Sequence, residues 1–188
     1  MPEPAIDIEV MIDDPSWRSV PRVKSLVARA AAAALAAAMP ARVRAGACVA
    51  LVGDKAIARL NHDFRGEPEP TDVLAFPQLP GGTRSIAAQL RHRLGARERI
   101  GLGDIVVAFG VSTRGARESK LTLAHHVAHL VAHGALHLVG HDHAAAAETA
   151  RMRALERRAL AELGIADPYR ATDGAAARGP APAGDRRR

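Results

Sequence analysis

Three histidines in the second half of the chain have the spacing of a three-ligand metal site. His133 and His137 are four residues apart, so on an α-helix they lie one turn apart on one face and both imidazoles can reach a single ion. Gly140 follows, and glycine readily adopts the positive-φ conformation that ends a helix and reverses the chain. We expect this turn to bring His143 back as a third ligand.

Three neutral imidazoles suit zinc, which binds histidine nitrogen at about 2.0–2.1 Å in tetrahedral geometry. Three protein ligands leave the fourth position for water, as in catalytic zinc sites. Zinc lowers the pKa of this water to about 7, so hydroxide is available at neutral pH. The spacing therefore predicts one catalytic Zn²⁺ ion held by His133, His137 and His143, although imidazoles also accept other first-row metal ions.

The same region offers other histidine pairs. His125 with His129, and His129 with His133, are also four residues apart, but neither pair is followed by its own glycine turn and third histidine. Three histidines at i, i+4 and i+8 on a straight helix span roughly 12 Å, which is too far for one ion. We prefer the set that ends in His143 and keep the other pairs as alternatives.

The spacing from His133 to His143 also matches the metzincin peptidases, with one difference. Those enzymes place a glutamate, the general base, directly after the first histidine, and here that residue is Gly134. Peptide hydrolysis would lack its usual proton acceptor. Asp142 is a nearby substitute, but a carboxylate beside a ligand more often orients the imidazole. A metallopeptidase is therefore the weaker hypothesis.

A phosphodiester substrate agrees better with these residues and with the charge of the chain. The net charge of +6 and the pI near 10.6 favour a polyanionic partner such as nucleic acid. In phosphoryl transfer, negative charge develops on phosphoryl oxygens, where a metal ion and a guanidinium stabilise it. Arg65 is our candidate for this guanidinium. Its alternative role is structural, as a cation that interacts with the dipole at a helix C-terminus.

The hydrophobic pattern predicts the elements that position these residues. Alternating or continuous apolar runs predict four strands, at residues 5–12, 48–52, 73–76 and 105–109. Apolar residues with helical spacing predict four helices, at residues 19–40, 54–66, 112–138 and 144–163. Residues 78–101 lack a clean hydrophobic period, so we expect an extended, mobile loop there.

These elements do not strictly alternate, which predicts an α+β fold. We expect a single domain at residues 1–170, with a small, about four-stranded mixed sheet packed against helices and the metal site at the end of a long helix. Residues 171–188 are rich in alanine, glycine, proline and arginine and are expected to form a disordered tail. Cys48 is the only cysteine, and we see neither a basic leader nor a membrane span, so we expect a cytoplasmic protein.

Six segments together form a recognisable set of motifs: residues 60–66, 70–77, 103–105, 129–143, 163–164 and 167–169. They resemble the YbeY family of bacterial metal-dependent endoribonucleases, and the resemblance spans most of residues 5–170. It implies zinc held by His133, His137 and His143, with Arg65 at the position of the family's functionally important arginine. The chain departs from the family at His141, where the family usually has tyrosine, in the longer segment 78–101 and in the tail.

The resemblance also implies a function. We expect cleavage of single-stranded RNA, maturation of the 3′ end of small-subunit (16S) rRNA and a part in ribosome quality control. The implied partners are rRNA, proteins of the small ribosomal subunit and a ribosome-associated GTPase. The main alternative is a non-catalytic ribosome assembly factor that binds rRNA and uses zinc only to hold its helix ends together.

Overall fold

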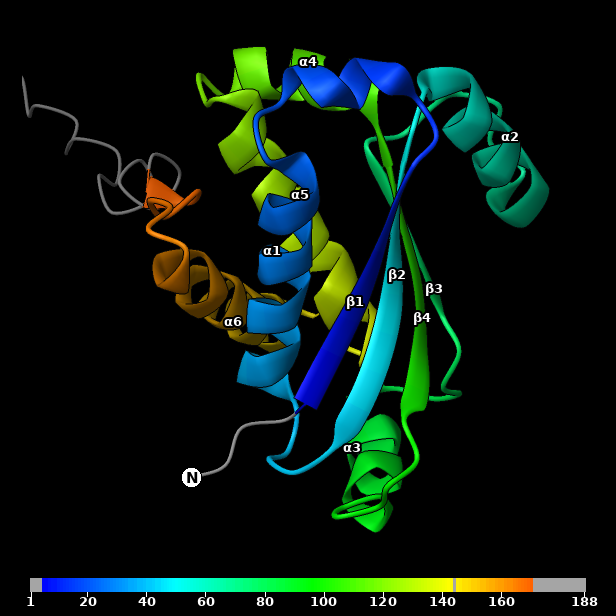
Figure 1. Ribbon diagram of the computed structural model, residues 1–188, viewed down its shortest axis with the longest axis vertical. Coiled ribbons are helices and arrows are strands. Elements are labelled where there is room, and N and C mark those ends of the chain that lie inside the picture. Colours follow the sequence, from blue (N-terminus) through cyan, green and yellow to red (C-terminus); the bar gives the residue numbers. More distant parts are fainter. Residues whose placement is uncertain (1–4, 144, 171–188) are drawn as a thin grey trace, which may run out of the picture.

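Four strands form one mixed sheet in the order β1-β2-β4-β3 (Figure 1). The computed structural model describes residues 5–143 and 145–170. β1 (Ala5–Ile12), β2 (Arg44–Val52) and β4 (Ile100–Ala108) run parallel, and β3 (Val73–Pro77) is antiparallel to β4. The predicted α+β fold with a small mixed sheet is confirmed.

The main hydrophobic core lies between one face of the sheet and three helices. Figure 1 shows α1 (Val23–Ala38), α5 (Leu123–Leu138) and α6 (Ala146–Glu162) together on this face. α5 is the most enclosed of them, because nine of its residues are buried. On the opposite face, α2 (Asp54–Arg65) packs Ile57 against Val52, Leu74 and Val106. A short 3-10 helix, Pro15–Ser19, joins β1 to α1.

The prediction of a mobile loop at residues 78–101 is wrong in part, because this segment contains the helix α3 (Thr83–His92). Only two of its residues are buried, Ile86 and Leu90, at 1% and 2% exposure. They are four residues apart, so they lie on one face and both join the main core. Two large apolar residues on a short helix give only a weak periodic signal, so tertiary packing provides most of the stability of α3.

The predicted long helix before the histidine motif is two helices. α4 (Phe109–Glu118) ends near Lys120, whose φ is 56°, and α5 then begins after Thr122. The Thr122 side chain accepts a hydrogen bond from the backbone N–H of His125, as expected of an N-cap. The helix that carries the metal motif therefore has its own defined start.

The other predicted elements exist with small shifts of their ends. β2 and β4 begin four and five residues before the predicted strands. Asp54, at the start of α2, caps α4, since its carboxylate accepts hydrogen bonds from the backbone N–H groups of Gly110 and Val111 at 2.8 and 3.1 Å. The predicted disordered tail, residues 171–188, lies outside the described residues.

Candidate metal centre

The end of α5 and the turn that follows it carry the three predicted ligands. His133 and His137 lie in the last two turns of α5, which ends at Leu138. Gly140 has a φ of 81° and donates its backbone N–H to the carbonyl of His137, while the N–H of His141 bonds back to Leu136. This pair of bonds is a Schellman motif, so the predicted glycine turn is confirmed.

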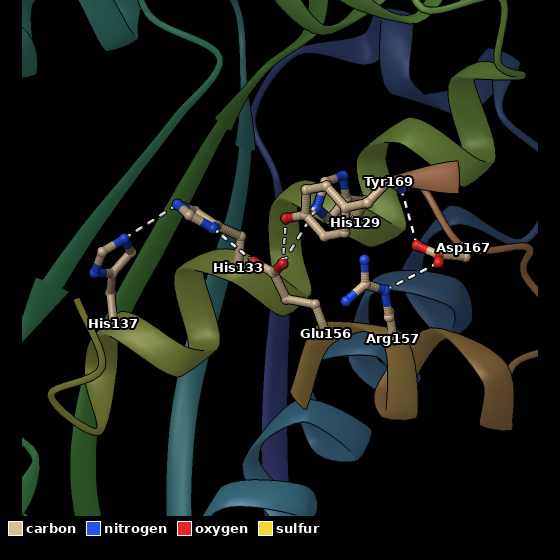
Figure 2. A network of polar contacts seen from close by, with 7 residues as sticks. All are labelled: His129, His133, His137, Glu156, Arg157, Asp167 and Tyr169. Carbon is tan, nitrogen blue, oxygen red and sulfur yellow. Dashed lines mark hydrogen bonds and ion pairs between the residues drawn. The ribbon is translucent and has the colours of Figure 1, made fainter. Parts of the chain in front are cut away.

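The turn brings His143 to the other two imidazoles. One ligand nitrogen from each of the three histidines lies within 4.8 Å of the others. The imidazoles of His133 and His137 face each other (Figure 2), and their Nε2 atoms are 3.1 Å apart. The ring of His143 lies 5.7 Å from that of His133 and 5.3 Å from that of His137, measured between centroids. The predicted residues thus form one cluster that can bind a metal ion.

The electrostatics of the cluster favour the neutral, metal-binding form of the central histidine. Burial, together with the neighbouring His133 and His143, lowers the pKa of His137 to about 4 from its ordinary value of 6.5. His137 is therefore neutral at physiological pH, and one ring nitrogen keeps the lone pair that a metal needs.

Among residues 5–143 and 145–170, no other group of histidine, cysteine or acidic residues is arranged to hold a metal ion. His129 instead places its Nε2 atom 3.1 Å from the hydroxyl of Tyr169. His125 is exposed near the start of α5. The alternative pairs are thus not completed by a third ligand in the described part of the chain.

Gly134 lies on the side of α5 that packs against the sheet. A Cβ atom at this position would be 2.9 Å from Cγ2 of Ile105 and 3.5 Å from Cγ2 of Val73. Ile105 is completely buried and cannot easily move aside. The position at which a metzincin carries its catalytic glutamate therefore has no room for a longer side chain.

Helix α3 supports the turn that carries His143. A Cβ at Gly140 would lie 2.8 Å from the backbone of Gly82 and Thr83, so glycine is required both by φ and by this close approach. The hydroxyl of Thr83 donates a hydrogen bond of 2.6 Å to the carbonyl oxygen of Gly140. The segment that lacked a pattern in the sequence thus contributes directly to the site.

A buried glutamate, which the sequence analysis did not single out, contacts the first histidine from α6. The carboxylate of Glu156 is 1% exposed, and its Oε1 atom lies 2.7 Å from Nδ1 of His133 (Figure 2). Burial alone would raise the pKa of Glu156, but hydrogen bonds with His129, His133 and Tyr169 lower it to about 2. Glu156 is therefore ionised at neutral pH.

The cluster opens into a cleft of about 1220 Å³. The predicted catalytic residue Arg65, at the end of α2, lines the same cleft as the histidines. Arg84, in the first turn of α3, and Arg151, in α6, line it as well. All three guanidinium groups are exposed, and among the described residues none of them makes an ion pair.

Comparison with known proteins gives the same family as the sequence motifs. The family model described as endoribonuclease YbeY matches residues 13–164. The chain belongs to the YbeY family. The endoribonuclease YbeY of Alkalilimnicola ehrlichii is 44% identical over 169 residues, which cover 89% of this chain and 93% of that protein. The endoribonuclease YbeY of Maricaulis maris is 38% identical over 162 residues, 86% of this chain and 91% of that protein.

A third YbeY relative, from Sphingopyxis alaskensis, is 46% identical over 121 residues, 64% of this chain and 69% of its own length. A solution structure from Thermotoga maritima covers 84% of this chain and 91% of its own, with 22% identity and a TM-score of 0.48. No helix within residues 5–143 and 145–170 is both long and apolar enough to cross a membrane.

His141, where we expected a departure from the YbeY family, lies beside the cluster and leaves it intact. His141 is 7% exposed and is not one of the three clustered histidines. Burial, followed by the charge of Arg151, lowers its pKa. Asp142 is exposed and accepts a hydrogen bond of 2.7 Å from the backbone N–H of His143, so it helps to fix the turn.

Proposed function

We propose that this protein is a zinc-dependent endoribonuclease that cleaves single-stranded RNA. The observation that carries the proposal is the convergence of three imidazoles at one cleft that also exposes guanidinium groups with no ion-pair partner in the described structure. Membership of the YbeY family, whose relatives are named endoribonucleases, supports the choice of RNA. The net charge of +6 agrees with a polyanionic substrate.

The ligand set fits zinc. Two nitrogen ligands of a tetrahedral zinc ion, each at about 2.0–2.1 Å, lie about 3.3 Å from each other. The distance of 3.1 Å between the Nε2 atoms of His133 and His137 is close to that value. When bound, zinc supplies a Lewis acid that polarises a phosphoryl oxygen and makes hydroxide available near neutral pH. Only His133, His137 and His143 are assigned as ligands, so one position is left for water or substrate.

The three arginines of the cleft are suited to hold the phosphate backbone. Arg65 is the proposed catalytic residue, which stabilises the negative charge that develops on the phosphoryl oxygens. Arg84 and Arg151 project from α3 and α6 and are proposed to bind flanking phosphates. Because they come from three separate elements, the fold must be intact for all of them to face one RNA strand.

A metallopeptidase is disfavoured by the packing of α5. The tight contact of Gly134 with Ile105 leaves no space for the glutamate that metzincins use as a base. An assembly factor with structural zinc predicts a fourth protein ligand, and the described residues offer only three.

The test compares zinc-loaded protein with His137→Ala on unpaired RNA and on the same sequence in a duplex. We expect cleavage of the unpaired RNA by the native protein and none by the variant, because removal of one of three ligands abolishes the site. His125→Ala is the matched control, since His125 lies on the same helix outside the cluster and should retain both zinc and activity. Equal cleavage by the native protein and His137→Ala would refute the proposal, and RNA binding without any cleavage would favour the assembly factor.

We further propose that the substrate is the 3′ end of small-subunit rRNA and that the enzyme acts in the cytoplasm with ribosomal proteins and a ribosome-associated GTPase. The support is the resemblance of the sequence motifs and the family match. Depletion of the protein should cause small-subunit rRNA with an extended 3′ end to accumulate. Complementation with His137→Ala should fail, whereas His125→Ala should restore the mature end.

A further inference from the structure

Both carboxylate oxygens of Glu156 have a polar partner. Oε1 lies 2.7 Å from Nδ1 of His133, and Oε2 accepts a hydrogen bond from the hydroxyl of Tyr169. His129 completes the network, with its Nε2 atom 3.1 Å from the Tyr169 hydroxyl and 3.7 Å from Oε2 of Glu156. Figure 2 shows the carboxylate between the imidazole of His133 on one side and the rings of His129 and Tyr169 on the other.

Packing alone does not explain a carboxylate at this position. Glu156 is 1% exposed and shares the inner face of α6 with Met152, Ala159 and Leu160, all of which are buried. An apolar residue there would avoid the desolvation that a buried charge incurs. Each oxygen has its own donor, which is the condition under which a buried carboxylate is tolerated. We therefore relate the buried charge to the residues that it contacts, and one of them, His133, is a proposed metal ligand.

The geometry points to Glu156 as a positioning residue that keeps the proton of His133 on Nδ1 and so leaves the lone pair on Nε2 for the metal. This inference rests on the proposed metal site. The tautomer of a neutral histidine is set by the hydrogen bond that one ring nitrogen makes, and an ionised carboxylate accepts only from a protonated nitrogen. With Nδ1 donating to Glu156, the unprotonated Nε2 faces His137, 3.1 Å away.

Tyr169 determines the direction in which Glu156 presents its oxygens. Its hydroxyl occupies Oε2, so Oε1 is the oxygen that faces His133. The backbone N–H of Tyr169 donates to Asp167, which also accepts a hydrogen bond of 2.9 Å from Arg157. The guanidinium of Arg157 lies 5.2 Å from the centroid of the tyrosine ring. Asp167 and Tyr169, which follow α6, thus bond to Arg157 and Glu156 of α6, and Glu156 in turn contacts His133 of α5.

The inference can be tested first without metal and without RNA. In metal-free native protein at neutral pH, nitrogen NMR of His133 should show a protonated Nδ1 and an unprotonated Nε2. In Glu156→Gln the amide can donate to Nδ1, so the proton should move toward Nε2. Glu162→Gln, an exposed acid on the same helix, is the matched control and should leave the His133 spectrum unchanged. A native His133 that carries its proton on Nε2 would overturn the inference, whichever variants fold.

Zinc affinity provides the second measurement. Loss of a carboxylate that orients a ligand histidine typically weakens metal binding by about 10–100-fold, and we expect this range for Glu156→Gln. Tyr169→Phe keeps the ring and removes only the hydroxyl, so it should produce a smaller loss in the same direction. Unchanged affinity in both variants overturns the inference. If the native protein shows the expected tautomer and binds zinc but does not cleave RNA, the proposed activity fails while the positioning role stands.

Discussion

Replacement of Gly140 by alanine tests whether α3 supports the turn that carries the proposed ligand His143. Alanine at a φ of 81° suffers left-handed strain of about 1–2 kcal/mol. Its Cβ would also lie 2.8 Å from backbone atoms of Gly82 and Thr83, and overpacking of this kind costs about 1–3 kcal/mol. The sum predicts that Gly140→Ala lowers the free energy of unfolding by about 2–5 kcal/mol.

Gly164→Ala is a close control for the strain alone. Gly164 has a φ of 73° and ends α6 with the same two backbone hydrogen bonds, from Gly164 to Ala161 and from Ile165 to Leu160. A Cβ at Gly164 meets no atom within 4 Å. This variant should therefore lose only about 1–2 kcal/mol. The entropy that alanine removes from the unfolded chain is the same in both variants and cancels in their difference.

Urea denaturation of metal-free protein in the presence of a chelator gives both free energies without a contribution from zinc. We expect Gly140→Ala to be less stable than Gly164→Ala by about 1–3 kcal/mol, the part due to contact with α3. Zinc binding should weaken in Gly140→Ala alone, because only that turn carries His143. Equal destabilisation of the two variants, to within about 0.5 kcal/mol, would refute the supporting role of α3.

Three more outcomes are expected. Arg65→Ala should keep zinc and lower the cleavage rate by about 10²–10³-fold, and lost zinc would show that Arg65 is structural. Arg59→Ala, on the same helix outside the cleft, is the control and should keep both zinc and the native cleavage rate. Arg84→Ala should weaken RNA binding and reduce the slope of log affinity against log salt by about 1, and an unchanged slope would exclude a phosphate contact. The free energy of unfolding of the metal-free protein should decrease as the pH falls from 6.5 to about 4, because in that range His137 takes up a proton only in the unfolded state. His137→Gln lacks this group, so its free energy of unfolding should depend less on pH. The same pH dependence in both proteins would contradict the lowered pKa of His137.

The sequence contained enough information to predict the sheet, the turn at Gly140 and the cluster of three histidines. Alternating apolar residues define β1, and helical spacing with a following glycine defines the end of α5. These signals are local, since each depends on residues within one element. The family match confirms the resemblance drawn from the motifs.

The remaining features depend on contacts between distant segments. The sequence did not predict α3, because this helix depends on the contact of Ile86 and Leu90 with the core. It did not single out Glu156 either, because α6 carries several other acidic and basic residues and nothing in their order indicates that Glu156 is the buried one. Glu156 is 23 residues from the histidine that it contacts. No sequence pattern within α5 or α6 indicates that the two helices meet at His133 and Glu156.

The close approach of Gly134 to the sheet has an evolutionary consequence. Glutamate at this position becomes sterically possible only after Ile105, and to a lesser extent Val73, has been exchanged for a smaller residue. Such an exchange leaves a cavity of its own until the glutamate arrives, so the order of substitutions is constrained and each intermediate is less stable. Two lineages that share this histidine spacing are therefore separated by an epistatic barrier that lies in the packing of α5 against the sheet.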